Sequence, residues 1–375
     1  MRLISEKVRI ESYQERHIPW VQEFNRRLGG KYGASKFPES NVPSWLPPTK
    51  SHRLYQEFFL AVDDETVRGA YILKHQDFFI RGRAISIAAY QFPISEGIIN
   101  PDFMEVAILL TLDALQRQPN LFALGMGSYS ESFPRLLKAM RWSFCEIPFY
   151  FKVIHPFHFL RKIAFLRKAL PGKVLLDFAA FTGVGWLGIR ALQTFKTHRP
   201  IGARIRVEEF DEFDERANIL WNRVKQEYAA IAVRDSLNLN ILYPRLSPKF
   251  KRIHVFEGER NIGWAVLLDT PMSCHKQFGS MRVGSIVDCL SHPDDAAKIL
   301  SAAADYLSLR RVDIIISNHS HKSYREAYEK AGFFRGPSNF LFAASKKLDS
   351  LMEPFEVTKD QIYFMRGDGD GPINL

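Results

Sequence analysis

An acidic side chain and an imidazole lie close together near the end of a segment that we predict to be a strand. The segment covers residues 284–290, Asp288 lies within it, and His292 follows it by two residues. Either group could accept a proton, and histidine is the side chain that titrates near neutral pH, which suits a general base. Simpler roles stay open, because Asp288 could bond to neighbouring backbone and His292 could cap the helix that we predict over residues 293–309.

Two glycine-rich segments resemble known binding loops, and each also has a plainer explanation. Residues 183–188 match the pattern Gly-x-Gly-x-x-Gly after an apolar segment at residues 174–178, which would suit a dinucleotide or S-adenosylmethionine. The βαβ unit that such a fingerprint requires does not follow, so tight helix packing is the simpler interpretation. Residues 366–371 resemble the start of a calcium loop, but the chain ends before a bidentate glutamate, and we predict a surface turn.

Composition and cysteine content narrow the class of protein. The chain has 375 residues, of which 46% are hydrophobic and 25% charged, and this is typical of a globular protein with two or three domains. Cys145, Cys274 and Cys289 are odd in number and lack metal-ligand spacing, so we expect free thiols and no metal site. Residues 1–20 lack the apolar run of a secretory signal, and we therefore expect a cytoplasmic location.

The elements that would position the candidate residues repeat along the chain. Residues 7–26 align with residues 204–223 without a gap. Further matches follow in the same order: residues 67–73 with 261–267, and residues 132–142 with 323–333. An ordered series of this kind indicates one fold used twice.

Each copy is predicted to have the order strand, helix, three strands, helix, strand, helix, strand. The second copy supplies the clearest boundaries: strand 205–210, helix 214–228, strands 250–256, 261–268 and 284–290, helix 293–309, strand 312–317, helix 322–331 and strand 339–344. The first copy is expected to end with a strand at 147–153. We therefore predict an α+β fold, layered as in α/β proteins, in which each copy has a mixed sheet flanked by helices. The expected parts are two domains, a connector and a tail: residues 1–153, 154–203, 204–349 and 350–375.

The net charge of +10 is concentrated in one segment. Residues 152–206 contain 11 Lys and Arg and a single acid, Asp177, which accounts for the whole excess. Apolar residues alternate with these charges, and a basic amphipathic segment is attracted to anionic lipid headgroups or to nucleic-acid phosphates. We expect peripheral attachment to an anionic membrane surface. RNA, including tRNA, is a less favoured partner, and a solvated helical pair that bridges the domains is the plainer alternative.

A six-residue motif carries a family resemblance. The segment from Tyr328 to Phe333 reads Tyr-Glu-Lys-Ala-Gly-Phe and lies in a predicted helix that follows a predicted strand. It resembles the YEKxGF ending of the GNAT acyltransferase superfamily, and the predicted element order of both halves is similar to that fold. Chains with two such domains include Fem-type aminoacyltransferases and acyltransferases of surface-polysaccharide pathways, which this chain loosely resembles.

The resemblance implies where the donor and the catalytic groups would lie. In GNAT enzymes two central parallel strands part, and the pantetheine of acetyl-CoA or another acyl-CoA bonds to the exposed strand edge. Residues 284–290 and 312–317 correspond to these strands. The residues that would then contact the donor are Cys289, Leu290 and Asn318 in the second copy, and Ser95, Glu96 and Gly97 in the first.

Catalytic roles follow from the same resemblance. Tyr328 would protonate the leaving thiolate, and Asp288 or His292 would take the proton of the amine. The first copy has Leu137 where the second has Tyr328, so we expect the first copy to be degenerate and the active site to lie in the second.

The pyrophosphate site departs from the family pattern. Where GNAT enzymes have Gln/Arg-x-x-Gly-x-Gly/Ala, residues 291–295 read Ser-His-Pro-Asp-Asp and residues 95–100 read Ser-Glu-Gly-Ile-Ile-Asn. Proline removes a backbone donor, and acidic residues in the first turn would repel a diphosphate. An acyl carrier protein or an aminoacyl-tRNA therefore remains open as the donor.

We predict a transferase that moves an acyl or aminoacyl group from a thioester or ester donor to the amine of a small molecule or lipid-linked precursor. A non-catalytic binding or scaffold protein is the first alternative. A methyltransferase that uses S-adenosylmethionine at residues 183–188 is the second.

Overall fold

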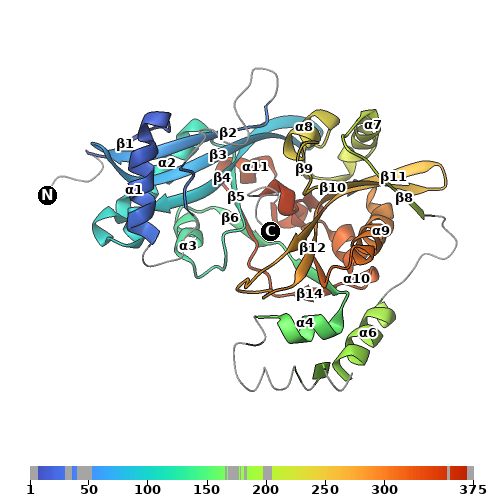
Figure 1. Ribbon diagram of the computed structural model, residues 1–375. Coiled ribbons are helices and arrows are strands. Elements are labelled where there is room, and N and C mark those ends of the chain that lie inside the picture. The colour runs from blue at the N-terminus through green and yellow to red at the C-terminus, as the bar shows by residue number, and fades with distance from the viewer. Residues whose placement is uncertain are drawn as a thin grey trace. The chain divides into compact units, whose positions relative to one another are not determined.

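The protein comprises two compact units, which we describe separately. The computed structural model describes residues 7–29, 36–39, 53–164, 167, 177, 179–180, 184–196, 205–352 and 355–369. Unit 1 comprises Met1–Cys145 and Leu341–Thr358, and unit 2 comprises Glu146–Phe340 and Lys359–Leu375. Figure 1 shows the elements of both units.

Unit 1 is a mixed sheet with helices on its two faces. Its elements are β1 (Arg9–Ser12), α1 (Ile18–Gly29), β2 (Tyr55–Asp63), β3 (Thr66–Ile80), β4 (Arg83–Ser95), α2 (Met104–Arg117), β5 (Leu121–Leu124), α3 (Ser132–Ala139), β6 (Ser143–Glu146), β15 (Leu341–Ala344), α11 (Lys346–Leu351) and α12 (Phe355–Thr358). The strand order is β1-β2-β3-β4-β5-β15-β6. β4 and β5 run parallel to each other, because α2 crosses between them.

The two faces of this sheet have separate cores because successive side chains of a strand point to opposite faces. Phe58, Leu60 and Val62 of β2 pack in one cluster with Val21 and Phe24 of α1. The intervening residues of β2 pack on the other face, in a cluster that includes Val106, Leu110 and Ala114 of α2. Each helix therefore buries one apolar stripe against the sheet.

Unit 2 repeats this architecture. Its elements are β7 (Phe149–Val153), α4 (Pro156–Lys162), α6 (Val184–Lys196), β8 (Ile205–Glu209), α7 (Glu215–Val224), β9 (Ala230–Ala232), α8 (Ser236–Leu242), β10 (Lys251–Glu257), β11 (Arg260–Pro271), β12 (Arg282–Ser291), α9 (Ala296–Leu309), β13 (Ile314–Asn318), α10 (Lys322–Lys330), β14 (Phe334–Gly336) and β16 (Ile362–Tyr363). The strand order is β8-β10-β11-β12-β13-β7-β14, with β12 and β13 parallel. The predicted α+β architecture of two mixed sheets flanked by helices is confirmed.

One strand of each sheet comes from the other half of the sequence, which the sequence analysis did not anticipate. We expected residues 147–153 to close the first sheet and residues 339–344 to close the second. Instead, β7 pairs with β13 of unit 2, and β15 pairs with β5 of unit 1. β7 and β15 have equivalent positions in their sheets. β7 lies beside β13 and β15 lies beside β5, which are the second strands of the two parallel pairs. The apolar pattern identified both strands correctly, but it carries no information about which equivalent edge each one joins.

Gly69 and Gly263, which match in the sequence alignment, have the same structural role. A Cβ on Gly69 would lie 2.9 Å from side-chain carbons of Val106 and Leu110 in α2. A Cβ on Gly263 would lie 2.7 Å from Ile299 of α9 and 2.4 Å from a strand carbonyl. In both units the central helix packs directly on the backbone of the third strand, which explains why glycine occupies both positions.

Candidate active site

The parallel strands of unit 2 part along their length, as the family resemblance implies. β12 pairs with β13 only between residues 283–285 and 314–316. From there β12 continues to Ser291 with β11 alone as a neighbouring strand. We refer to the region beyond Ser285, where the two strands are not paired, as the β12–β13 gap.

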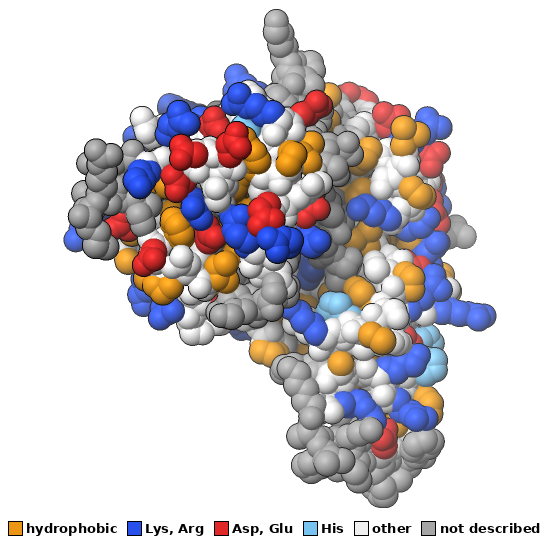
Figure 2. Space-filling view, turned by 60° about the vertical axis from the view of Figure 1, so that its left-hand side comes forward, with side chains coloured by type: hydrophobic (Ala, Val, Ile, Leu, Met, Phe, Trp, Pro, Cys, Tyr) orange, Lys and Arg blue, Asp and Glu red, His pale blue; other side chains and the backbone are white. Residues whose placement is uncertain are grey.

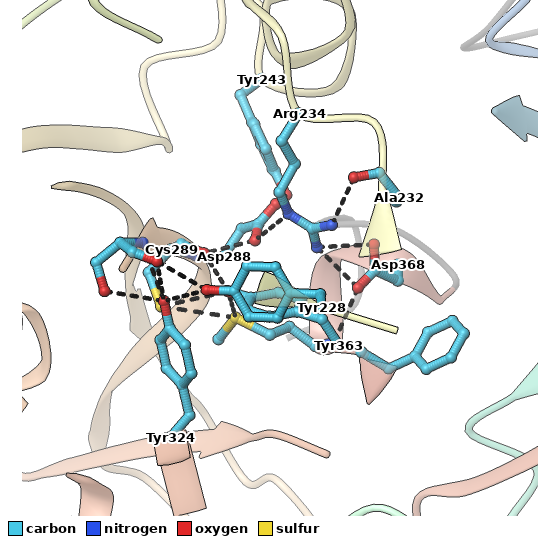
Figure 3. Close-up of polar contacts among 12 residues, drawn as sticks. Tyr228, Ala232, Arg234, Tyr243, Asp288, Cys289, Tyr324, Tyr363 and Asp368 are labelled. Atoms are coloured by element: carbon cyan, nitrogen blue, oxygen red, sulfur yellow. Dashed lines mark hydrogen bonds and ion pairs between the residues drawn. The ribbon is translucent and has the colours of Figure 1, made fainter. Parts of the chain in front are cut away.

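Side chains of unit 2 occupy the backbone hydrogen-bonding groups of β12 in this gap (Figure 3). The Cys289 carbonyl accepts a hydrogen bond from the hydroxyl of Tyr363. The Ser291 N–H donates to Tyr324 Oη at 3.0 Å, and the Ser291 carbonyl accepts from Tyr228 Oη at 2.7 Å. The N–H of Cys289 donates to the carboxylate of Asp288 at 2.9 Å. A pantetheine that used these groups would have to displace buried side chains.

The C-terminal segment of the chain supplies the residue that contacts Cys289. Ile362 and Tyr363 form β16, which pairs in parallel with β9. The Phe364 N–H donates to Ser320 Oγ at 2.7 Å, and Met365 forms an antiparallel bridge with His319 just after β13. The segment therefore lies against both β12 and the end of β13, where a donor would otherwise enter.

Asp288, one predicted base, belongs to a buried ion network instead. Its Oδ1 accepts from Arg234 Nε at 3.0 Å, and its Oδ2 accepts from Tyr243 Oη at 3.0 Å. Burial raises the pKa of Asp288 to about 6, against the opposing effect of the Arg234 charge. Because both oxygens are engaged and the side chain is buried, the geometry does not leave Asp288 free to take a proton from an acceptor.

Arg234 is the centre of this network, and it belongs to none of the sequence motifs described above. Two nitrogens of its guanidinium lie 3.0 Å from Asp288 and 2.8 Å from Asp368, and Arg234 Nη1 donates to the Ala232 carbonyl at 3.1 Å. The guanidinium carbon lies 4.6 Å from the centre of the Tyr363 ring. The network joins β12 to the C-terminal segment through one buried cation (Figure 3).

The predicted surface turn at residues 366–371 is wrong for the part that the structure describes. Arg366–Asp368 form a single turn in which Gly367 and Asp368 are buried. A Cβ on Gly367 would lie 2.3 Å from the hydroxyl of Tyr243. Because Gly367 has no side chain, the backbone of this turn can lie close to Tyr243 and the ion network. Asp370 and Gly371 lie outside the described residues.

Tyr328, the predicted acid, is buried and has a hydrogen-bond partner. Its hydroxyl donates to Ser317 Oγ at 2.7 Å, and Ser317 Oγ donates to the Ile286 carbonyl at 2.8 Å. Its ring stacks on Tyr150, with ring centres 4.7 Å apart. Burial raises the pKa of the Tyr328 phenol well above its ordinary value. The role of acid requires access to a thiolate, and this packing supports a structural role instead.

Replacing Tyr328 with phenylalanine tests that structural role. The variant loses one buried hydrogen bond and keeps the stacked ring, so we expect the free energy of unfolding to fall by about 1 kcal/mol. Urea unfolding measures this change, and donor binding should stay at the wild-type level. A stability equal to that of the wild type together with loss of turnover would restore Tyr328 as a catalytic residue.

His292, the other predicted base, caps a helical turn. Its Nδ1 accepts from the N–H of Asp294 at 3.3 Å, and the turn Pro293–Asp295 leads into α9. The imidazole also lies near the carboxylates of Asp294 and Glu227, at 3.5 and 3.8 Å. The simpler alternative from the sequence, a capping histidine, matches this geometry.

The other donor-contact candidates of unit 2 are also engaged or buried. Cys289 and Leu290 are buried, and burial raises the pKa of the Cys289 thiol. Asn318 accepts from Arg366 Nη1 at 3.1 Å and donates to the Pro148 carbonyl at 3.3 Å. These contacts hold β13 to neighbouring segments of unit 2.

Unit 1 contains the equivalent parting between β4 and β5. These strands pair only at Ala88 with Leu121 and Ala89 with Phe122, although β4 continues to Ser95. We refer to the region beyond Ala89 as the β4–β5 gap. Among the residues that the structure describes, no side chain hydrogen-bonds to the backbone of Phe92 or Ile94. The gap of unit 1 thus differs from that of unit 2.

Backbone strain marks the same place in β4. Phe92 has a φ of +48°, in the left-handed region that aromatic residues rarely adopt. The register with β3 shifts beside it, because Ile72 is opposite Gln91 while Ala70 is opposite Ile94. Bulges and strained residues of this kind are concentrated near functional sites.

Apolar side chains lie around the start of the β4–β5 gap. Tyr90 and Ala123 belong to the buried cluster beneath α2, and half-buried Met126 and Phe133 pack against that cluster. The rings of Tyr90 and Phe133 are 5.6 Å apart. Such surroundings suit an acyl chain better than a charged group.

Ser95, Glu96 and Gly97 form the turn after β4. Ser95 Oγ accepts from the N–H of Gly97 at 3.1 Å, and Glu96 pairs with Arg27 and Arg68 at 3.0 and 2.9 Å. The positive charges of Arg27 and Arg68 offset the negative charge of Glu96, which we expected to repel a diphosphate. However, the N–H groups of residues 97, 99, 100, 102 and 103 all have partners within the turn, so they are not available to bind one.

The two glycines of the 183–188 motif that the structure describes lie in a helix. Gly185 and Gly188 lie within α6, and a Cβ on Gly185 would lie 2.7 Å from Leu160, which fits tight helix packing. Gly183 and the apolar segment at 174–176 lie outside the described residues. Within the described part of the chain, no three His, Cys, Asp or Glu residues are arranged to hold a metal ion.

Comparison with known proteins identifies the fold. The sequence matches no protein-family model and no curated protein. In structure, the chain is similar to a conserved protein of unknown function from Enterococcus faecalis V583, described as a probable N-acyltransferase, with a TM-score of 0.53 and 9% identity over 93% of this chain and 74% of that one. It is also similar to Saccharomyces cerevisiae N-myristoyltransferase with bound myristoyl-CoA and inhibitors, with a TM-score of 0.54 and 9% identity over 90% and 79%. These likenesses show the fold, which is consistent with tandem GNAT-like domains.

Proposed function

We propose that this protein is an acyltransferase that holds the thioester arm of its donor in the β4–β5 gap of unit 1. The observation that carries the proposal is the contrast between the two gaps. Tyrosine hydroxyls and a carboxylate occupy the backbone groups of β12. In contrast, β4 has a strained bulge at Phe92, and within the described part of the chain no side chain hydrogen-bonds to the backbone of Phe92 or Ile94. An extended pantetheine satisfies unpaired strand groups as a neighbouring strand would.

The donor class that fits is an acyl group on phosphopantetheine. Apolar Met126 and Phe133 suit the acyl chain, and the amides of the turn after β4 are not free to hold a diphosphate. Both acyl-CoA and an acyl-acyl carrier protein present this arm. The similar N-myristoyltransferase is solved with bound myristoyl-CoA, which favours acyl-CoA. The acceptor that we propose is an amine on a small molecule or a lipid-linked precursor.

Photocrosslinking of the full chain tests the location of the donor. An acyl-CoA with a diazirine in its acyl chain, and the same acyl group on acyl carrier protein, are each irradiated with the protein and mapped by mass spectrometry. We expect labels within residues 83–95 and 121–133, and a rise in the melting temperature with the same ligands. Labels within residues 282–291 or 314–318 would instead place the donor in unit 2.

A variant of unit 2 supplies the matched control. Replacing Tyr363 with phenylalanine removes the hydroxyl that contacts the Cys289 carbonyl and leaves unit 1 unchanged. Donor affinity should therefore stay within about twofold of the wild type, since the altered group lies outside the proposed site. A change of tenfold or more would contradict the assignment to unit 1.

A non-catalytic binding protein is the second candidate, because Tyr328 is buried and the turn amides are occupied. Saturating donor binding without transfer to any of a panel of amines would favour it. Absence of both labelling and thermal stabilisation would overturn the acyltransferase proposal as well.

A further inference from the structure

Two short helices of unit 2 each expose an aromatic ring with an arginine one turn further along. In α4, Phe157 is 40% exposed and the guanidinium carbon of Arg161 lies 5.9 Å from the ring centre. In α6, Trp186 is 39% exposed and the guanidinium carbon of Arg190 lies 5.2 Å from the ring centre. Residues four apart are neighbours on a helix surface, so each pair presents an apolar group and a cation together.

Packing of α6 on α4 fixes which residues face outward. Gly185 lies against Leu160 of α4, and Ile189 packs on the cluster that contains Phe159 and Leu160. Leu187 and Leu192 remain 60% and 57% exposed. Figure 1 places α4 and α6 side by side, and Figure 2 shows hydrophobic and basic side chains interspersed on the lowest part of the described surface.

The local charge on these helices is positive. Arg161, Lys162 and Arg190 are exposed. The acid of the segment, Asp177, accepts hydrogen bonds from both terminal nitrogens of Arg167 at 2.8 Å, and Arg161 Nε lies 3.9 Å from the same carboxylate. Four cations, Arg161, Lys162, Arg167 and Arg190, are therefore offset by this one carboxylate, and the local charge stays positive. A surface with several exposed large hydrophobic groups and excess cations is complementary to an anionic lipid bilayer.

We infer that α4 and α6 dock the protein on a membrane that contains anionic lipid. Trp186, Phe157 and Leu187 would enter the interfacial layer, while Arg161 and Arg190 would contact lipid phosphates, as the aromatic and basic residues of interfacial helices do. No helix among the described residues is long and apolar enough to span a bilayer. Docking through α4 and α6 would bring a lipid-linked acceptor, the class proposed above, near the protein.

The exposed aliphatic residues favour lipid over RNA as the partner. Arginine and tryptophan could contact either lipid or RNA. The exposed side chains of Leu187 and Leu192 favour lipid, because their transfer from water into an apolar phase lowers the free energy. A different exposed apolar stripe, formed by Met104, Ile108 and Leu112 of α2, adjoins the acidic Glu105, and the only basic residue of α2 is Arg117 at its end. That stripe fits anionic lipid poorly, which makes it a suitable control.

Flotation of the full chain with liposomes tests the inference. Wild-type protein should float with vesicles of phosphatidylcholine containing phosphatidylglycerol, and it should float weakly with phosphatidylcholine alone. The double variant Arg161→Gln/Arg190→Gln should bind the anionic vesicles roughly 25-fold more weakly at low salt, or about fivefold for each cation. The variant Trp186→Ser/Leu187→Ser should bind them about tenfold more weakly.

The control variant Leu112→Ser removes an exposed apolar residue of α2 and should bind as the wild type does. All the substituted residues are exposed, and circular dichroism serves to check that each variant is folded. Equal flotation of wild type and both α4–α6 variants would overturn the inference. Binding to tRNA without flotation on anionic vesicles would overturn it in favour of a nucleic-acid surface.

Discussion

Replacing Arg234 with methionine should lower the free energy of unfolding by about 3–5 kcal/mol, the range for breaking a buried ion network from one side. The substitution keeps much of the side-chain volume but removes the cation that faces Asp288 and Asp368. Both carboxylates would then be buried without their main partner. Because folded domains are stable by only about 5–15 kcal/mol, this single change should unfold unit 2 at a much lower denaturant concentration.

Urea unfolding, followed by tyrosine and tryptophan fluorescence, measures the effect. Arg260, which is half-exposed and pairs with Glu257, provides the matched control. Arg260→Met should cost less than about 1 kcal/mol, as an exposed pair contributes little. The triple variant Arg234→Met/Asp288→Asn/Asp368→Asn should recover part of the loss, since it leaves no unpaired charge. A cost for Arg234→Met no larger than that of Arg260→Met would show that the buried network does not hold the C-terminal segment.

The periodic segments of this chain could be located from sequence because their signals are local. The predicted helix at 322–331 is α10 (Lys322–Lys330), and the predicted strand at 284–290 is the middle of β12. The short β9 and α8 between α7 and β10 were missed, because three and seven residues are too few for a clear period. The exchange of β7 and β15 was missed because strand pairing is a long-range choice between two similar edges.

The site residues were harder to predict, because a catalytic role requires an accessible side chain and the spacing of residues in the sequence gives no information about accessibility. A tyrosine in a YEKxGF helix can be either an accessible proton donor or a buried ring, and the sequence looks the same in both cases. The ring of Tyr328 is buried. Arg234 lies 54 residues from Asp288 and 134 from Asp368, so no local motif joins them. The available signal was an arginine directly after the apolar run at 229–233, where a charge needs a buried partner.

Acidification from pH 6.5 to pH 4 should destabilise unit 2, because three of its histidines are buried in the uncharged form. Burial lowers the pKa of His254 and of His321 to about 4, and it lowers the pKa of His319 well below its ordinary value. In the unfolded chain the same groups titrate near pH 6.5. Within this window the unfolded state binds more protons, so the stabilisation present above pH 6.5 is lost as the pH falls.

Asp288 has the opposite effect on stability at low pH, so the net effect depends on how many protons each state binds. Its pKa is raised to about 6 in the folded state, so between pH 6 and 4 the folded state holds a proton that the unfolded state has released. Protonation of Asp288 on acidification therefore stabilises the fold. For these four groups alone, three histidines against one carboxyl leave an excess of up to two protons on the unfolded state, which corresponds to a slope of about 2.7 kcal/mol per pH unit. The lowered pKa values of Glu208, Asp214 and Glu257, which are paired with arginine or lysine, act in the same direction as the histidines.

Replacing one histidine isolates its share of the slope. His254 stacks on Phe210, with ring centres 4.1 Å apart, and its Nδ1 lies 3.2 Å from Asn261 Nδ2. His254→Gln cannot titrate, so the dependence of unfolding free energy on pH should become shallower by up to about 1.4 kcal/mol per pH unit between pH 6 and 4.5. The wild-type slope, measured over the same pH range, is the reference. If His254→Gln also kept that slope, His254 would have to be protonated in the folded protein, and its desolvation inside unit 2 could not be the source of acid sensitivity.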